Sequence, residues 1–414
     1  MAIDPPGSRD LDQAYHGERT STGFTVHYAI ADVAAFVEPG GPLDQESRSR
    51  GVTYYSPDRR CSLYPEILSE GAASLLEDSA RQALLWTISL DNDGALIDAR
   101  LERARVRVRA AVSYSLVQEQ LDNGSAEESI SLLRTIGLLR QRQERDRGGV
   151  SLNLPGQEVV RSGDSWELRY DHSLAVEGWN AQISLLTGIA AADLMVQHGT
   201  GLLRTLPPPA RDVVDELRTQ ALVLGVAWPE EMEYPEFIRS LRPEVPSEIA
   251  LLNQATGVLR GAGYLAFQDT TPDHAEHCAI ASTYAHVTAP LRRMADRYVN
   301  EILLAICADR PLPTWALEAL PDLPSELDRA RSRESSLERA TVDWVEATTM
   351  RHRIGETFPA VVTRRLDDEK VRAQLLSPAV IAKVRDSKVT PGSEVDLTLT
   401  DADPSSRRVV FDLR

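Results

Sequence analysis

The sequence contains few cysteines, few aromatic residues and no long apolar run. Aromatic residues make up 6% of its 414 residues, and there are three cysteines. These are Cys61, Cys278 and Cys307, and their wide spacing excludes a disulfide framework and predicts reduced thiols in a cytoplasmic protein. Because no apolar run reaches the length of a membrane span and the first residues lack a basic-then-apolar signal, we expect no association with a membrane.

Basic residues are also scarce relative to acidic ones. Lysine and arginine number 45 against 62 aspartates and glutamates, which gives a net charge of −17. Phosphate backbones favour clustered basic residues, so this composition argues against a nucleic acid as the partner. It does not exclude a local basic channel, and an acidic surface elsewhere would limit unspecific binding.

The length of the chain allows two domains. Strands are expected at residues 24–33, 83–90 and 97–109, and Asp91-Asn92-Asp93-Gly94 predicts a hairpin turn between the last two. An apolar stripe at helical spacing predicts a helix over residues 126–147, followed by a hairpin over 150–170. Further helices are expected at residues 182–198, 210–224, 247–260, 290–308 and 325–353. This order predicts one α+β domain over residues 1–353.

The character of the sequence changes after Gly355. Short segments separated by Gly and Pro turns predict a small β-barrel of the OB type over residues 355–414. Its expected strands are 358–364, 370–376, 380–384, 394–399 and 407–413. Since the aromatic residues there are Phe358 and Phe411, such a barrel would hold single-stranded nucleic acid mainly by charge. Basic residues concentrate in it: Arg364, Arg365, Lys370, Arg372, Lys383, Arg385 and Lys388.

Three carboxylates lie close together near the N-terminus, those of Asp4, Asp10 and Asp12. In an extended segment Asp10 and Asp12 point to the same side, and the Pro5-Pro6-Gly7 turn can fold Asp4 back toward them. Arg9 would limit their repulsion. Gathered carboxylate oxygens suit a hard cation such as Mg²⁺, which breaks phosphodiesters by activating water and steadying the leaving oxygen. The alternative is a solvated Pro/Gly loop without a metal.

Several ordered blocks of the sequence resemble the ribonuclease II / ribonuclease R (RNB) family. The run from Ile3 to Ala14 resembles its I-D-x5-D-x-D-D-A signature, and residues 28–33 resemble its H-I-A-D-V segment. Residues 42–57 resemble P-L-D…R-G-x-S-x-Y-x-P, and residues 64–75 resemble L-P-E-x-L-S-x-G…S-L. The sequences of residues 4–8 and 179–188 are similar to those of a compact bacterial subgroup of the family. The resemblance extends over about residues 2–350.

The resemblance implies an RNB catalytic domain followed by an OB-fold RNA-binding domain of the ribosomal-protein type. It implies a 3′-to-5′ hydrolytic exoribonuclease that degrades single-stranded RNA to nucleoside 5′-monophosphates. Mg²⁺, or Mn²⁺, would be held by Asp4, Asp10 and Asp12, and Asp12 matches the aspartate most closely tied to catalysis. We expect the protein to act as a monomer.

A second motif, Tyr284 to Arg297, resembles the family's Y-A-x-x-T-S-P-I-R-[RK]-x-x-D. Pro290 suits the first turn of a helix, and helix-start amides with the guanidinium of Arg292 would form a phosphate site. Arg292 matches the family's catalytic arginine at the scissile phosphate, and Arg293 beside it is expected to contact RNA. Asp296, one turn later, could orient either arginine. Without the resemblance, Arg292 would be a surface arginine on an amphipathic helix.

Two further residues are assigned to RNA binding by the resemblance. Tyr55 matches a tyrosine that stacks on nucleotides near the 3′ end and helps to fix the length of the final product. Glu338 matches a glutamate that approaches the 3′-terminal ribose, whose 2′-hydroxyl distinguishes RNA from DNA. The alternatives are a packed turn tyrosine beside Pro57 and an exposed helix glutamate.

The sequence departs from the family at Gln13, where a fourth aspartate is expected, and at Gln182, which falls near a family glutamate. Glutamine offers a carbonyl oxygen but no charge, so a metal would be held more weakly. These losses leave a second hypothesis open, namely a catalytically impaired RNB-like protein that binds RNA without cleaving it.

Overall fold

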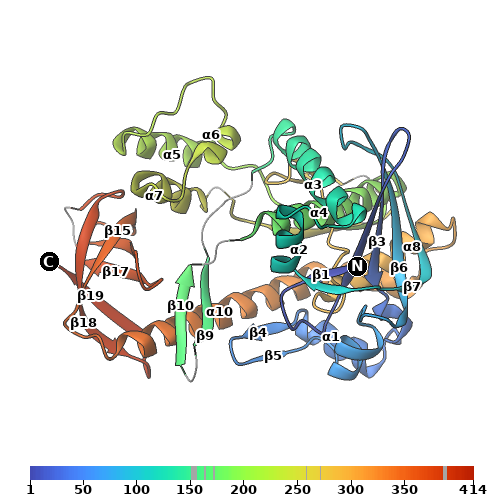
Figure 1. The fold of residues 1–414 in the computed structure, drawn as a ribbon, viewed down its shortest axis with the longest axis horizontal. Coiled ribbons are helices and arrows are strands. Elements are labelled where there is room, and N and C mark those ends of the chain that lie inside the picture. The colour runs from blue at the N-terminus through green and yellow to red at the C-terminus, as the bar shows by residue number, and fades with distance from the viewer. Residues whose placement is uncertain (151–155, 163–164, 171–172, 258, 271, 386–388) are drawn as a thin grey trace.

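The computed structural model describes residues 1–414 apart from 151–155, 163–164, 171–172, 258, 271 and 386–388. An α/β body forms most of the molecule, and the long helix α10 (Leu323–Met350) runs from it to a β-barrel at the C-terminus (Figure 1). The expected architecture, an α+β part followed by a small OB-type barrel, is confirmed.

The main sheet of the body is antiparallel, with the strand order β2-β3-β6-β7. Its strands are β2 (Gln13–Arg19), β3 (Gly23–Ala31), β6 (Ala80–Asp91) and β7 (Leu96–Arg107). At the predicted turn, Oδ1 of Asp91 accepts hydrogen bonds from the backbone of Asp93 and Ala95 at 2.9 and 2.8 Å. Gly94 has φ +76°, which only glycine adopts readily, so the turn sequence explains the β6–β7 hairpin.

Smaller strand pairs surround this sheet. β1 (Ala2–Asp4) pairs in parallel with β8 (Ala111–Ser113). The antiparallel pairs are β4 (Tyr54–Ser56) with β5 (Arg59–Cys61), β9 (Gln157–Ser162) with β10 (Ser165–Tyr170), β11 (Gly201–Thr205) with β12 (Gly263–Phe267), and β13 (Glu276–His277) with β14 (Ser282–Thr283). The β9–β10 pair confirms the hairpin expected over 150–170, of which 151–155 and 163–164 lie outside the described residues.

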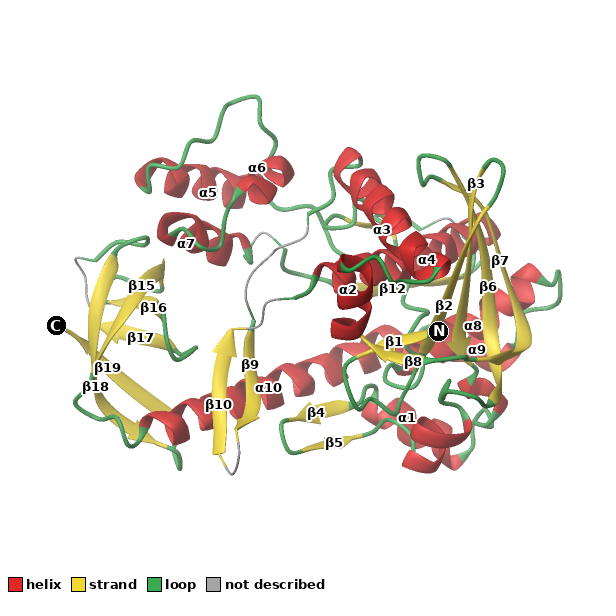
Figure 2. Ribbon diagram, in the orientation of Figure 1, coloured by secondary structure: helices red, strands yellow, loops and turns green. Residues whose placement is uncertain are grey.

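The helices are α1 (Pro42–Arg50), α2 (Tyr114–Asp122), α3 (Glu128–Asp146), α4 (Ala175–His198), α5 (Arg211–Val223), α6 (Tyr234–Ser240), α7 (Pro246–Ala255), α8 (Met294–Cys307), α9 (Thr314–Ala319) and α10. Helices α3 and α8 pack against the main sheet, whereas α7 packs against the barrel (Figure 2). A 3₁₀ turn covers Val33–Ala35 and a π turn covers Leu68–Ala72. In the part of the chain that the structure describes, no helix is both long and apolar enough to cross a membrane.

A close approach in the core positions the second motif. The amide of Ala285 donates to the carbonyl of Gly188 in α4 at 3.0 Å. A Cβ atom at Gly188 would lie 2.2 Å from the Tyr284 ring and 2.6 Å from the Ala285 carbonyl. Only glycine therefore lets α4 and the segment after β14 lie this close.

The barrel has the strand order β17-β16-β15-β18-β19, and Phe358 and Phe411 pack edge to face in its core at 6.1 Å. Its strands are β15 (Thr357–Arg365), β16 (Lys370–Leu375), β17 (Ile381–Arg385), β18 (Glu394–Asp403) and β19 (Arg408–Leu413). Basic residues meet across β16 and β17: Lys370 opposes Arg385, and Arg372 opposes Lys383. Lys388 lies outside the described residues. The barrel thus carries a basic face, while both its phenylalanines are buried.

Candidate active site

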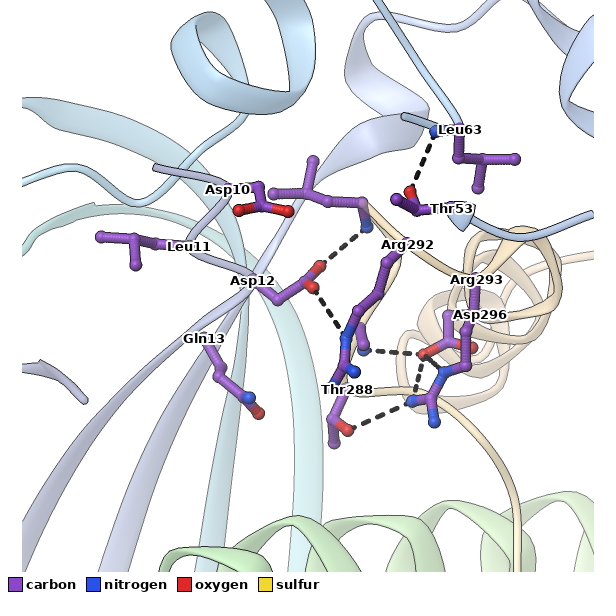
Figure 3. Close-up of polar contacts among 12 residues, drawn as sticks. Asp10, Leu11, Asp12, Gln13, Thr53, Leu63, Thr288, Arg292, Arg293 and Asp296 are labelled. Carbon is purple, nitrogen blue, oxygen red and sulfur yellow. Dashed lines mark hydrogen bonds and ion pairs between the residues drawn. The ribbon is translucent and has the colours of Figure 1, made fainter. Parts of the chain in front are cut away.

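Asp12 directly precedes β2, and its side chain is 5% exposed. Its Oδ1 accepts a hydrogen bond from the backbone amide of Leu291 at 2.7 Å, and its Oδ2 lies 3.5 Å from Nε of Arg292 (Figure 3). Burial raises the pKa of Asp12 to about 7, although the charge of Arg292 and the Leu291 hydrogen bond both act to lower it. A carboxylate buried in this way favours a nearby cation.

Asp10 faces a different set of partners. Its Oδ1 lies 2.7 Å from Nη1 of Arg60 on β5, and its Oδ2 accepts a hydrogen bond from the Tyr55 hydroxyl at 3.3 Å. Arg60 also pairs with Glu70. From the sequence, Arg9 is expected to offset the charge of the carboxylates. Its Nε instead lies 3.6 Å from Oε2 of Glu70, and Arg60 is the arginine that pairs with Asp10. The expectation for Arg9 is therefore wrong.

Asp4 ends β1 and lies close enough to Asp10 for their charges to interact. Burial raises the pKa of Asp4, and the charge of Asp10 adds to this, while Ser8 and Arg292 act to lower it. The charge of Arg292 thus acts on both Asp4 and Asp12 and lowers the pKa of each. Among the described residues, however, no three His, Cys, Asp or Glu side chains gather closely enough to hold a metal ion on their own.

The segment that carries Arg292 is not the start of a helix, so that prediction is wrong. Helix α8 begins at Met294, and Pro290 to Arg292 form a separate turn. Arg293 is extended, with φ −130° and ψ 120°, and forms a β-bridge with Val52. Helix-start amides therefore do not face the Arg292 side chain.

The hydrogen bonds around this turn explain why it stays outside the helix. Oδ2 of the buried Asp296 accepts from the Ala289 amide at 2.7 Å and from Nη2 of Arg293 at 2.8 Å. The amide of Thr53 donates to the Arg292 carbonyl at 3.0 Å. Asp296 therefore orients Arg293 rather than Arg292, and the Arg292 side chain is left half exposed beside Asp12.

A cavity of about 180 Å³ adjoins Arg292. Tyr55 and Glu334 line it, whereas Glu338 lies exposed one turn further along α10. Burial, together with the charge of Glu338, raises the pKa of Glu334. The structure therefore places Glu334 against this cavity and leaves Glu338 near its rim. Its other lining residues are Val52, Thr53, Arg204, Tyr264, His286, Arg293, Leu327 and Arg331.

The two glutamines that replace family carboxylates both have defined partners. The carbonyl oxygen of Gln13 accepts a hydrogen bond from the buried Tyr28 hydroxyl. The amide nitrogen of Gln182 donates to Glu144, so a carboxylate from α3 lies against the position where the family has its own. Gln13 therefore uses its oxygen within the fold.

The donor set fits a hard divalent cation better than a soft one. Asp4, Asp10 and Asp12 offer only oxygen atoms, and burial raises the pKa of both Asp4 and Asp12, an effect that a bound cation would offset. Mg²⁺ usually keeps several water ligands and needs only one or two protein carboxylates. A group of three closely packed ligands is therefore not required.

Comparison with known proteins identifies the family. The RNB domain model matches residues 1–309, and the model of the RNase II-type exonuclease C-terminal S1 domain matches residues 356–414. The chain belongs to the RNB family. Its barrel is thus the S1 domain found at the C-terminus of RNase II-type exonucleases, in line with the OB-type barrel expected from the sequence.

Relatives of the RNB chain are named as exonucleases. Exosome complex exonuclease RRP44 homolog A of Arabidopsis thaliana is 27% identical over 358 residues, which cover 82% of this chain and 38% of that protein. Ribonuclease R of Escherichia coli K12 is 23% identical over 404 residues, covering 89% of this chain and 49% of that protein. The chain thus spans less than half the length of these two relatives.

Solved structures share the RNB fold over the whole chain. Mycoplasma genitalium RNase R, in complex with ribose-methylated single-stranded RNA, superposes with a TM-score of 0.89 at 19% identity, covering 100% of this chain and 70% of that one. Yeast Ssd1, described as a pseudonuclease, gives a TM-score of 0.74 at 18% identity, covering 98% of this chain and 50% of that one. The fold therefore occurs both in a nuclease and in a protein described as lacking that activity.

Sequence reasoning missed several residues that line the site. Arg60 reaches Asp10 from the hairpin that carries Tyr55, and His286 lies within the second motif. The Tyr264 hydroxyl lies 2.8 Å from Nδ1 of His286, and burial with nearby arginines holds the pKa of His286 well below its usual value, so the ring is neutral. The motif itself contained His286, but nothing in the sequence linked it to Tyr264 or Arg60.

Proposed function

We propose that this chain is a 3′-to-5′ exoribonuclease that hydrolyses single-stranded RNA to nucleoside 5′-monophosphates with the help of Mg²⁺, or of Mn²⁺. One observation carries the proposal. The carboxylate of Asp12 and the guanidinium of Arg292 lie 3.5 Å apart beside a cavity lined by Tyr55, although the two residues are far apart in the sequence. Membership of the RNB family supports it.

The carboxylates of Asp4, Asp10 and Asp12 would hold the metal ion, which when bound supplies an activated water and offsets charge on the phosphate. Arg292 would bind the scissile phosphate and stabilise the charge that develops on its oxygens. Its guanidinium is half exposed and therefore accessible to a substrate. The Leu291 amide fixes the Asp12 carboxylate, so the acidic and basic groups keep one relative position.

The RNA would be held at several points. Tyr55, which is 48% exposed, would stack its ring on a base near the 3′ end, and Arg293 would add positive charge at the cavity. Glu338 or Glu334 would accept a hydrogen bond from a ribose 2′-hydroxyl. The basic face of the S1 barrel would attract the phosphate backbone, which answers the objection raised by the net charge of −17.

A second candidate function is an RNB-like protein that binds RNA without cleaving it. Gln13 favours it, because its side chain carries no charge and its oxygen already accepts the Tyr28 hydrogen bond. The likeness of the fold to that of a protein described as a pseudonuclease is in line with this candidate.

Product analysis distinguishes the two. We expect the purified chain, given uniformly labelled single-stranded RNA and Mg²⁺, to release nucleoside 5′-monophosphates that co-migrate with authentic standards. Nucleoside 3′-monophosphates would contradict the proposed hydrolysis, and RNA that is bound but intact would favour the binding protein. We also propose a monomer that acts in the cytoplasm, and size-exclusion chromatography tests the oligomeric state.

A further inference from the structure

A second cavity, of about 370 Å³, lies where the α/β body meets the S1 barrel. We call it the tryptophan cavity. It is formed by the tip of the β4–β5 hairpin, by β10, by the C-terminal half of α10 and by the turn between β18 and β19. The residues that matter here are Ser56, Asp58, Trp166, Thr341, Trp344 and Arg407. None of them belongs to the site around Asp12.

The composition of the tryptophan cavity is unusual for a surface groove. Trp344 is 43% exposed, and Trp166 is partly buried against the barrel core. Exposed apolar patches rimmed by polar residues are typical of binding sites, and here the rim is provided by Ser56, Asp58 and Arg407. The S1 barrel lacks stacking aromatics of its own, because Phe358 and Phe411 are buried in its core.

Charge in the tryptophan cavity is divided between its two ends. Arg407 is exposed and lines the cavity at the barrel end, and its side chain forms no ion pair in the part of the chain that the structure describes. At the hairpin end, the Ser56 hydroxyl donates to Asp58 at 2.8 Å, which provides hydrogen-bonding groups of the kind that bind base edges and ribose hydroxyls. A phosphate would lie toward Arg407, away from Asp58.

The position of the tryptophan cavity points to the same ligand as the active site. Ser56 follows Tyr55 directly on β4, so one hairpin borders both cavities. Helix α10 also borders both, with Glu334 at the active-site cavity and Thr341 at the tryptophan cavity. These residues are two helical turns apart, about 10 Å along the axis, a span that a few nucleotides cover. From there α10 continues to the barrel (Figure 1).

We propose that the tryptophan cavity binds one nucleobase and the adjoining phosphate of single-stranded RNA, on the 5′ side of the nucleotides held at Asp12. This rests on the proposed function, because it assumes that RNA occupies the active site. Trp344 and Trp166 stack on the base, which needs no particular sequence, and Arg407 binds the phosphate. The cavity joins the active site to the basic face of the barrel along α10 and gives the S1 domain the aromatic platform that its own strands lack.

The test measures RNA affinity as a function of length, in the full chain carrying Asp12→Asn so that RNA is not degraded. Single-stranded oligonucleotides from a dinucleotide upward are titrated at fixed salt. In the parent we expect affinity to rise in a step at the length that reaches the tryptophan cavity. Trp344→Ala should remove this step and weaken long RNA about fivefold or more, while short RNA binds as before. Trp344→Phe should restore most of it.

Two further variants serve as a control and as a second test of the cavity. Leu222→Ala removes an apolar side chain that is 81% exposed on α5, and it should leave the length dependence unchanged. Arg407→Gln alters only an exposed turn residue and should reduce the salt dependence of long-RNA binding by about one phosphate contact.

The outcomes separate the two proposals. If Trp344→Ala and Arg407→Gln both bind long RNA as the parent does, the tryptophan cavity is not an RNA site, and a protein ligand becomes the alternative occupant, while the exoribonuclease proposal stands. If the parent binds RNA of no length, the proposed function fails and this inference fails with it.

Discussion

The backbone amide of Leu291 donates a hydrogen bond of 2.7 Å to Oδ1 of Asp12, across 279 positions of sequence. This contact fixes a buried carboxylate and, through the same turn, places the neighbouring Arg292 within 3.5 Å of its other oxygen. The two motifs that the sequence singled out therefore form one site. Because the hydrogen bond needs only an oxygen acceptor, the charge of Asp12 can be removed without breaking it.

Asp12→Asn should abolish cleavage and preserve both folding and RNA binding. The asparagine oxygen still accepts the Leu291 amide, but the charge that would hold the metal ion and offset Arg292 is gone. We expect a loss of rate of at least about a hundredfold, the usual cost of removing a group that stabilises transition-state charge. Asp98→Asn, which removes the same charge from an exposed position on β7, serves as the control. Full activity in Asp12→Asn would remove Asp12 from the site.

Tyr55→Ala should lengthen the shortest RNA that remains after exhaustive digestion. Stacking on a base contributes about 1–3 kcal/mol, which matters most for short RNA held at few points. Tyr55→Phe keeps the ring and loses only the hydroxyl contact with Asp10, so it should give the same final product as the parent. Gel electrophoresis of the end products measures this. An unchanged product in Tyr55→Ala would mean that Tyr55 only packs in its turn.

Gln13→Asp tests whether the missing carboxylate limits the enzyme. An added carboxylate beside Asp12 should lower the Mg²⁺ concentration needed for half-maximal rate, because one more charged oxygen becomes available to the ion. Gln13→Asn has the same length as Asp without the charge, and it should not share the gain. A silent parent that becomes active only as Gln13→Asp would instead establish the RNA-binding alternative.

Stability should depend on pH through Glu346, which connects α10 with the barrel. Glu346 is 5% exposed, and its carboxylate accepts hydrogen bonds from Gln157 at 2.8 Å and from the Ile381 amide at 3.1 Å. Burial raises its pKa from 4.5 to about 7. The folded state thus binds this proton more tightly than the unfolded state, so its stabilising contribution is lost as pH rises from about 4.5 to about 7.

Glu346→Gln keeps an oxygen acceptor and does not titrate. The difference in unfolding free energy between parent and variant should therefore shift in favour of the variant over this pH range, by up to about 3 kcal/mol. Denaturant titrations at several pH values measure it. Parallel pH profiles for the two proteins would show that Glu346 titrates normally.

Much of the fold could be predicted because its signals are local. The turn at Asp91 to Gly94 specifies a hairpin through its own hydrogen bonds and the positive φ of its glycine, and the helical stripe of α3 is likewise contained in a short stretch. The barrel was predictable for the same reason, since its strands are short segments separated by Gly and Pro turns.

The parts that sequence could not predict depend on contacts between distant segments. Pro290 favours a helix start, but the Asp296 carboxylate and the Thr53 amide hold residues 289–293 outside the helix. Asp296 belongs to the motif, whereas Thr53 is far away in the sequence and no local pattern indicates its contact. The charge that offsets Asp10 comes from Arg60 rather than from the adjacent Arg9, because the β4–β5 hairpin folds over it. The resemblance pointed to Glu338, and only packing of α10 shows that Glu334 lines the cavity.

The most direct test of the account uses a 5′-labelled single-stranded RNA, incubated with Mg²⁺ or with EDTA, beside DNA of the same sequence. The account predicts a ladder that shortens from the 3′ end with time, only on RNA and only with Mg²⁺. RNA that stays intact with Mg²⁺, or a ladder that persists in EDTA, would contradict it.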